Sequence, residues 1–361
     1  MKSTQSIKFL LIFLSFALAV TACSTGPAAT QQASPLQAPT NLPSPQPSPT
    51  LQPTAIRTPY PTATPIVVEG VGQTVQTIQL PNKSGLFPAF AMGSVWVPSP
   101  GLLIRIDPTT RQIVAEITVD EGRRGDPPYA VAADGNTVWA TEMIGASVVR
   151  IDPQTNEIVD RIPLEGGLHA IALDGDTLWV ANPGNDTLMR VDTQTKQIVA
   201  RIPVNFPSSI AIGAGSVWTV EHRAGNVLRI DPNTNSVVAT IPLGSGAWPS
   251  QLTFGEGAIW VGDLNASGIV SRIDPELNQV VATISTGIPV TSIEVGAGAV
   301  WAVVGEFEGC QKSGLVRIDS TTNTVVGRIP VRCAGDMVVS PEGFWVTSYQ
   351  YKELTLVEPQ E

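Results

Sequence analysis

The stretch GDTLWVANPGNDTLMRVDTQTKQIVARIPV, Gly175 to Val204, is the repeat that decides the fold. It contains three short runs rich in β-branched and aromatic residues, at 177–181, 187–191 and 197–203, with turn-forming residues between them. Such runs bounded by turn signals are typical of β-strands. A fourth run, His169 to Leu173, comes just before them. One copy therefore predicts a four-stranded antiparallel meander, and several copies predict a larger repeat architecture.

Two sequence markers recur in step along the chain. Seven tryptophans are spaced by 43, 40, 39, 42, 41 and 44 residues. An Arg-aliphatic-Asp motif follows six of them, and a degenerate form, Leu356-Val-Glu-Pro, follows the seventh. Four strands in a period near 42 residues are typical of β-propeller blades. We therefore predict an all-β, seven-bladed β-propeller of four-stranded antiparallel blades. The repeat tryptophans are Trp96, Trp139, Trp179, Trp218, Trp260, Trp301 and Trp345.

The two ends of the repeat region complement each other. The last repeat contains only three strand-like runs, and the segment Thr74 to Leu80 matches Val237 to Leu243, the outermost strand of another repeat. We expect this N-terminal strand to complete the last blade and close the ring. Closure removes the exposed sheet edges that a linear array would present.

The first 22 residues have the features of an export signal. Lys2 and Lys8 flank a polar start, an apolar run covers 9–20, and Val-Thr-Ala precedes Cys23. This ending resembles the lipobox of bacterial lipoproteins, which implies lipid on Cys23 and anchoring to a bacterial membrane at the cell surface or in the periplasm. The alternative is ordinary secretory cleavage after Ala22.

Residues 23–66 are predicted to form a lipidated, disordered stalk, and residues 67–361 the propeller. Ser24 to Ile66 contains eleven prolines among Ser, Thr, Gln and Ala, with Arg57 its only charge. Such a segment cannot bury enough apolar surface to offset its ordering entropy.

Charge and cysteine content narrow the possible partners. The formal net charge is −10, which disfavours nucleic acid, because nucleic acid requires a basic surface. No phosphate-binding or dinucleotide motif is present, so we expect no cofactor, and we expect a monomer. With Cys23 used for lipid, Cys310 and Cys333 remain, and an even number in an exported chain predicts a disulfide. Two unrelated buried thiols are the alternative.

The repeats resemble the YVTN family of seven-bladed propellers. Trp179-Val-Ala-Asn182, Arg190-Val-Asp192 and Ile202-Pro-Val204 carry the resemblance, although tryptophan replaces the usual tyrosine of that family. The resemblance implies the propeller fold over about residues 73–359 and says little about activity.

The streptogramin (virginiamycin B) lyases are a more distant resemblance. It implies an enzyme that uses histidines, acidic residues and a divalent metal on one face of the ring. This chain has two histidines, His169 and His222, which occupy different places in their repeats. The counterparts of His169 in four other repeats are not histidine: Tyr129, Ser208, Ser250 and Thr291. The spacing is therefore too irregular to assign a metal site.

Residues that repeat around the ring are expected to be structural. Asp followed by Pro suits a type I turn, so Asp107, Asp152, Asp231 and Asp274 are predicted to start turns. The tryptophans are expected to seal neighbouring blades. The arginine that recurs six times is expected to form a framework ion pair or a solvated edge.

Residues that differ between repeats are better functional candidates. Three residues after its tryptophan, each of four consecutive repeats carries an acid or amide, and both histidines are expected on the same rim. The candidate ligand-binding residues are His169, Glu142, Asn182, Glu221, His222 and Asp263. Solvated strand ends are the alternative interpretation.

The loop from Val304 to Gly314 carries Cys310, Glu306, Phe307 and Glu308, and is a second candidate docking region, together with Trp248 and Phe206 on neighbouring connections. We therefore predict a membrane-anchored extracytoplasmic module that binds a protein, peptide or glycan. The alternative is a lyase or hydrolase of the streptogramin-lyase type with a metal-assisted site on the rim.

Overall fold

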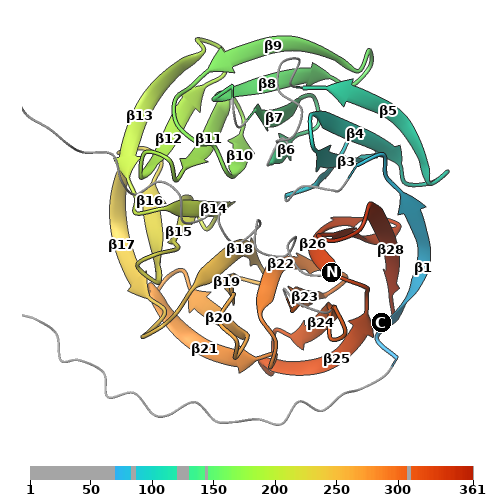
Figure 1. Cartoon of the computed structure of the whole chain (residues 1–361). Coiled ribbons are helices and arrows are strands. Elements are labelled where there is room, and N and C mark those ends of the chain that lie inside the picture. The colour runs from blue at the N-terminus through green and yellow to red at the C-terminus, as the bar shows by residue number, and fades with distance from the viewer. Residues whose placement is uncertain (1–69, 83–86, 120–129, 143–144, 307–309, 361) are drawn as a thin grey trace, which may run out of the picture. The chain divides into compact units, whose positions relative to one another are not determined.

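The computed structural model describes residues 70–82, 87–119, 130–142, 145–306 and 310–360. The predicted signal peptide, the stalk and Cys23 lie outside the described residues. Every regular element within those ranges is a β-strand, and the strands form seven four-stranded sheets. All neighbouring strands in each sheet are antiparallel, and the sheets are arranged as blades of one ring (Figure 1). The predicted seven-bladed propeller is confirmed.

Each blade runs from an innermost strand near the ring axis to an outermost strand (Figure 1). The innermost strands are β2 (Ala89–Ala91), β6 (Val131–Ala133), β10 (Ile171–Asp174), β14 (Pro207–Gly213), β18 (Pro249–Gly255), β22 (Val290–Gly296) and β26 (Ala334–Ser340). The second strands are β3 (Ser94–Ser99), β7 (Val138–Glu142), β11 (Thr177–Asn182), β15 (Ser216–Glu221), β19 (Ala258–Asp263), β23 (Ala299–Val304) and β27 (Gly343–Ser348). The third strands are β4 (Leu102–Asp107), β8 (Ser147–Asp152), β12 (Thr187–Asp192), β16 (Asn226–Asp231), β20 (Ile269–Asp274), β24 (Gly314–Asp319) and β28 (Glu353–Pro359). The outermost strands are β5 (Gln112–Thr118), β9 (Glu157–Pro163), β13 (Gln197–Pro203), β17 (Ser236–Pro242), β21 (Gln279–Ser285), β25 (Thr324–Pro330) and β1 (Gly72–Gln79). Blade 1 begins with β2 and blade 7 with β26.

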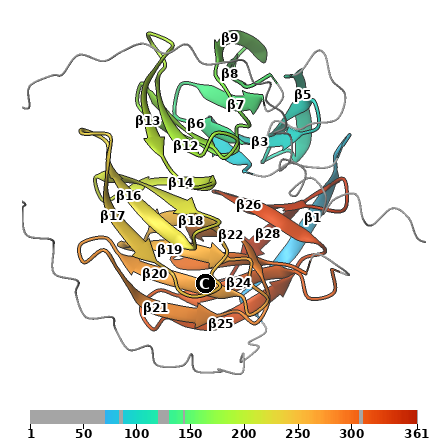
Figure 2. The ribbon, with the colours of Figure 1, turned by 60° about the vertical axis from the view of Figure 1, so that its left-hand side comes forward.

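The ring closes through β1, as predicted. This strand pairs antiparallel with β28 from Gly72 opposite Pro359 to Gln79 opposite Glu353, and it lies along the outer side of β28 in two views (Figure 1, Figure 2). The Leu80 N–H continues the pairing by donating to the Lys352 carbonyl at 2.8 Å. The last blade therefore contains strands from both ends of the described chain.

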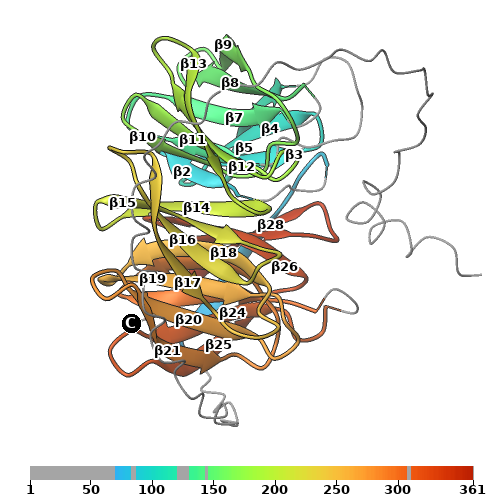
Figure 3. The ribbon, with the colours of Figure 1, turned by 90° about the vertical axis from the view of Figure 1, so that its left-hand side faces the viewer.

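Burial follows the place of each strand in the blade. The second strands are buried along nearly their whole length, because neighbouring blades cover both of their faces. The outermost strands alternate between exposed and partly buried residues and cover the side of the ring (Figure 3). This alternation is expected of strands with one solvated face.

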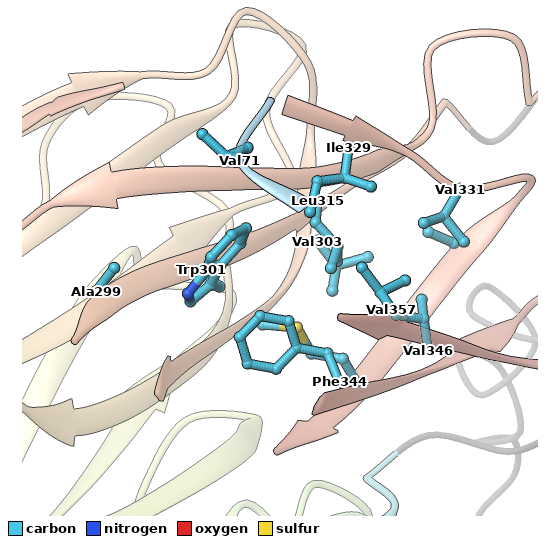
Figure 4. Close-up of a cluster of buried hydrophobic side chains, with 12 residues drawn as sticks. Val71, Ala299, Trp301, Val303, Leu315, Ile329, Val331, Phe344, Val346 and Val357 are labelled. Atoms are coloured by element: carbon cyan, nitrogen blue, oxygen red, sulfur yellow. The ribbon is translucent and has the colours of Figure 1, made fainter. Parts of the chain in front are cut away.

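Seven hydrophobic clusters hold the blades together, one at each junction. At the junction of blades 6 and 7, Trp301 packs against Phe344 with ring centres 4.8 Å apart, and Val71 joins the same cluster (Figure 4). Each repeat tryptophan belongs to the cluster between its own blade and the next. The predicted sealing role of the tryptophans is confirmed.

The repeated aspartates act as turn initiators. The Asp107 carboxylate accepts N–H groups from Thr109 at 2.8 Å and Thr110 at 3.0 Å, and the pKa of this carboxyl is lowered mainly by the hydrogen bond from Thr110. Asp152, Asp231 and Asp274 make corresponding bonds. The structural interpretation of these residues is confirmed.

The repeated arginines connect neighbouring blades through neutral acceptors rather than through ion pairs. The Arg229 Nη1 donates to the Pro275 carbonyl at 2.7 Å and to Asn278 Oδ1 at 3.0 Å, both in a turn of the next blade. Its guanidinium carbon lies 5.2 Å from the centre of the Trp218 ring. The framework role is confirmed, but the predicted ion pair or solvated edge is wrong, because the partners are a carbonyl, an amide and an aromatic face. The matching pairs are Arg105 with Asn156, Arg190 with Asn235, Arg229 with Asn278 and Arg272 with Asn323.

The junction between blades 2 and 3 lacks this arginine–asparagine pair, as do the junctions on either side of blade 7, where Arg317 donates to the Gln360 carbonyl and Leu356 replaces the arginine. In blade 3, Lys196 stands where the linked blades have asparagine. The buried Nε of Arg150 in blade 2 makes no hydrogen bond. Lys196 instead pairs with Asp160 Oδ1 at 2.7 Å, and this contact is the main cause of the lowered pKa of that carboxyl. A lysine–aspartate pair therefore replaces the arginine–asparagine link between blades 2 and 3.

We expect Asn278→Gly to lower the free energy of unfolding by about 1 kcal/mol, since it removes one acceptor of Arg229. Asn278 has a φ of 53°, and glycine adopts that backbone conformation without strain. Urea denaturation measures the change. In an Arg229→Leu background the same substitution should cost much less, and an equal cost in both backgrounds would show that the link contributes nothing.

Candidate functional site

The variable rim is the side of the ring that carries the loops between second and third strands and the connections between blades. Glu142, Asn182, Glu221 and Asp263 each end a second strand on this rim. The structure therefore places these four residues at corresponding points of four consecutive blades. Each side chain also makes hydrogen bonds to neighbouring strands or loops.

Glu142 and Asn182 are buried by such contacts. The Glu142 carboxylate accepts from the Ser147 hydroxyl and pairs with Arg161. The Asn182 amide donates to the Glu165 carbonyl at 2.5 Å and accepts the Asn185 N–H at 3.2 Å. Glu142 thus connects the later strands of its own blade, whereas Asn182 holds the loop after its strand and the connection from blade 2.

Glu221 and Asp263 bind the connections that lead into or out of their blades. Glu221 accepts the Asn205 N–H at 3.2 Å and the Asn226 amide at 2.9 Å. Asp263 accepts the Asn265 N–H at 2.6 Å and the Trp248 N–H at 3.2 Å, while burial raises the pKa of its carboxyl. A direct ligand-binding role for the four residues stays a prediction. Their hydrogen bonds also give each of them a structural role.

The two histidines are both held in one tautomer. His169, just before β10 rather than inside it as the sequence predicts, has Nδ1 at 2.8 Å from the Ser208 carbonyl. His222 has Nδ1 at 2.7 Å from the Pro249 carbonyl. Because a carbonyl only accepts, Nδ1 carries the proton in both rings. Burial lowers the pKa of His169 to about 4 and also lowers that of His222, so both rings are neutral at physiological pH.

His222 lies between two aromatic side chains on the variable rim. Its ring centre is 5.7 Å from that of Phe206 and 5.2 Å from that of Trp248. The Arg223 guanidinium covers the Phe206 ring at 4.2 Å. Trp248 is 52% exposed, unlike the buried repeat tryptophans. We call Phe206, His222, Arg223 and Trp248 the aromatic patch.

The backbone at the aromatic patch is also unusual. Phe206 has a φ of 53°, which is uncommon for a bulky side chain and is found where surrounding contacts impose it. Here the Phe206 N–H donates to Asp186 Oδ1 at 2.9 Å. Phe206 and Trp248 stand at the same repeat position, twelve residues before Trp218 and Trp260. The sequence predicts both residues as part of a docking region, and comparing repeats at this position would also have linked them to each other.

A second polar group lies near the ring axis, where sequence reasoning placed no site. Burial, followed by the neighbouring Asp336, raises the pKa of Glu294 in β22 to about 8. Burial also raises the pKa of Asp336 in β26. We call Glu294 and Asp336 the axial carboxyl pair. A carboxyl whose ionisation is opposed by burial and by a neighbouring carboxyl is a common feature of functional sites.

The sequence contains a weak signal for this pair. Glu294 and Asp336 stand seven and nine residues before their repeat tryptophans, and the equivalent positions in the first three blades are apolar. These two positions of the repeat are therefore apolar in the first three blades and include polar residues in the later ones. None of the candidate residues predicted from the sequence stands at these two positions.

The predicted disulfide between Cys310 and Cys333 is present, with a Cα–Cα distance of 4.6 Å. It connects the longest loop of blade 6 to the start of blade 7. The Tyr349 hydroxyl donates to the Glu306 carbonyl and Lys312 pairs with the Glu306 carboxylate at 2.9 Å. These contacts hold the described ends of the loop, whereas Phe307 and Glu308 lie outside the described residues.

Two features are absent from the described part of the chain. It contains no cluster of three or more His, Cys, Asp or Glu side chains arranged to hold a metal ion. Nor does it contain a helix of the length and apolarity needed to cross a bilayer.

Comparison with known proteins supports the fold and does not show a family. No family model matches the chain, and no curated protein matches it. Solved structures with similar folds include the β-propeller domain of Cps50 (Swd1) from Myceliophteria thermophila, at 12% identity and a TM-score of 0.66, covering 80% of this chain and 99% of that one. The resemblance to YVTN propellers and to streptogramin lyases therefore stays an expectation.

Two further structures have the same architecture. A chain of the mitotic checkpoint complex is 11% identical with a TM-score of 0.70, covering 86% of this chain and 100% of its own. A chain of hydrazine synthase from Kuenenia stuttgartiensis is 14% identical with a TM-score of 0.65, covering 83% and 99%. Similarity at such low identity indicates a shared propeller fold and nothing about shared activity.

Proposed function

We propose that this protein is a binding module whose aromatic patch docks a protein or peptide partner that presents an apolar side chain. The observation that carries the proposal is the half-exposed Trp248, ordered beside His222 and Phe206. Tryptophan and arginine are enriched among the residues that dominate binding energy. Trp248 and Arg223 lie on the same patch.

The surroundings of the patch support this function. His222 is neutral at physiological pH, so its ring adds contact area without a charge that would have to be desolvated. Asp263 accepts the Trp248 N–H, and this bond holds the backbone of the anchor residue before any partner arrives. A pre-ordered anchor loses less conformational entropy on binding. One of the similar solved chains belongs, by its printed name, to a protein complex.

We further propose that the module acts outside the cytoplasm, anchored through lipid on Cys23. The support is the sequence of residues 1–23, with its short apolar run and its Val-Thr-Ala-Cys ending. The proline-rich residues 24–66 would then separate the propeller from the membrane. Metabolic labelling with a fatty acid should modify the wild-type chain, whereas a Cys23→Ala chain that is still labelled would contradict the anchor.

Trp248→Ala should weaken partner binding at least about 30-fold, since truncating a central aromatic anchor costs about 2 kcal/mol or more. The partner can be trapped first by a photo-crosslinking amino acid placed at position 248. The affinity of the purified pair is then measured for wild type and variant.

Leu277→Ala is the matched control. Leu277 is also exposed, at 60%, and belongs to the same blade, but it lies in the turn between β20 and β21 on the opposite side of the ring. A crosslinker there should trap none of the same partner, and Leu277→Ala should bind normally. Equal trapping at both positions, or full affinity of Trp248→Ala, would contradict the proposed patch.

A further inference from the structure

At two positions of the repeat, near the ring axis, blades 4 to 7 carry oxygen-bearing side chains where blades 1 to 3 carry apolar ones. Nine residues before the repeat tryptophans stand Ser209, Gln251, Ser292 and Asp336, and seven residues before them stand Thr253 and Glu294. The equivalent residues of blades 1 to 3 are Phe87, Ala130, Ala170, Ala89, Ala132 and Ala172. One half of the ring axis is therefore polar, and the other half is apolar.

Asp336 joins three blades at the axis. Its Oδ2 accepts the Phe87 N–H of the first blade and the Gln251 amide of blade 5, both at 2.8 Å. Its Oδ1 accepts the Met337 N–H at 2.7 Å. The carboxylate is thus fixed in position by donors from opposite directions.

Ser292 of blade 6 lies between the two blades that the Gln251–Asp336 bond connects. Its side chain is completely buried and its hydroxyl faces Asp336. The geometry nevertheless falls short of a hydrogen bond, and the hydroxyl has no partner among the described residues. A buried polar group without a partner is rare and costly. This hydroxyl is therefore available to a ligand at this site.

Glu294 belongs to the same site. It comes two residues after Ser292, and therefore on the same face of β22, and the Thr253 side chain of blade 5 faces its carboxyl. Although Glu294 lies deep among the innermost strands, part of its surface stays accessible. None of the ion pairs within the described ranges involves Glu294 or Asp336. Two neighbouring carboxyls therefore lack a compensating positive charge.

We propose that Glu294 and Asp336, together with the Ser292 and Thr253 hydroxyls, bind one hard divalent cation, Ca²⁺, near the ring axis. The donor atoms are all oxygen, which excludes the soft metals that prefer sulfur and nitrogen. Two carboxylates and several neutral oxygens suit Ca²⁺, which accepts irregular coordination, better than Mg²⁺, which requires a near-ideal octahedron. The site is distinct from the rim residues and from the aromatic patch.

The test compares the full chain in EDTA and in CaCl₂ at matched ionic strength. Because only two ligands are charged, we expect weak binding, with a Kd on the order of 10⁻⁴–10⁻³ M. Addition of about 10 mM Ca²⁺ should therefore raise the Tm by roughly 3–5 °C and saturate. Titration calorimetry should give one Ca²⁺ per chain.

Glu294→Gln is the decisive variant, because it keeps the shape and hydrogen-bonding capacity of the side chain and removes its charge. It should fold and lose the Ca²⁺-dependent rise in Tm. Glu157→Gln, an exposed acid on the outer strand β9, should keep the full rise. If wild type shows no saturable rise, or Glu294→Gln shows the same rise, the site does not exist. Either result leaves the predictions for Trp248 unaffected.

Discussion

Removing β1 should convert the closed propeller into an unstable open array. A chain that starts at residue 81 lacks Val71, Ile78 and Leu80, which are all buried. Val71 belongs to the cluster between blades 6 and 7, and the other two belong to the cluster between blades 7 and 1. Burial of such a side chain is worth about 1.5–3 kcal/mol, so the truncation removes roughly 5–9 kcal/mol. This loss is comparable to the whole stability of a typical domain.

Urea denaturation and size-exclusion chromatography measure this effect. The truncated chain should lose its cooperative transition at low urea and form oligomers, because the outer edge of β28 becomes free to pair with another chain. A chain that starts at residue 67 keeps β1 and should behave like the full-length protein. Unchanged thermal stability after removal of residues 1–80 would show that ring closure by β1 is unimportant.

Glu294 should make the metal-free protein less stable as the pH rises. Its pKa is about 8 in the folded chain, against an ordinary value of 4.5. Between these two values the folded chain holds one more proton than the unfolded chain, so the free energy of unfolding falls with rising pH and levels off above about 8. Each unit of pKa difference corresponds to about 1.4 kcal/mol. The total is on the order of 5 kcal/mol as an upper limit, because part of the side chain stays accessible.

Glu294→Gln should remove most of this pH dependence. In EDTA we expect the variant and wild type to unfold at similar temperatures near pH 4, and the variant to be more stable above pH 8. Asp336 also has a raised pKa, so a smaller slope should remain in the variant. Thermal unfolding measured across this pH range provides the test. Identical slopes in the two proteins would mean that Glu294 ionises normally.

The strongest sequence predictions concerned features that repeat. The tryptophan recurs at one point of every blade and the Arg-aliphatic-Asp motif at one point of six blades. Local patterns alone were therefore enough to predict blade number, strand order and the structural role of Asp107 and its equivalents. The disulfide and the closing strand could also be predicted from sequence. The first followed from the even number of remaining cysteines, and the second from the one strand that the last repeat lacks. The arginine contacts were predicted less well, since the acceptor Asn278 lies 49 residues from Arg229 and only the blade-to-blade packing brings them together.

The candidate site was predicted only in part. Their spacing of three residues after the repeat tryptophan placed Glu142, Asn182, Glu221 and Asp263 on one rim, but a pattern cannot show that neighbouring strands and loops already hydrogen-bond to these side chains. The pairing of Phe206 with Trp248 was accessible in principle, because both stand at one repeat position. Their grouping around His222 required the structure.

The sequence by itself determined the blade, the number of blades and the way in which the ring closes, because each depends on periodic hydrophobicity and on short-range turn chemistry. Only the tertiary structure decided what lies at the ring axis. Asp336 binds Gln251 across 85 residues and Phe87 across 249, and no local pattern relates positions that far apart. Closing the ring brings the innermost strands of blades 1, 5, 6 and 7 together, and that geometry creates both the axial carboxyl pair and its lack of a positive partner.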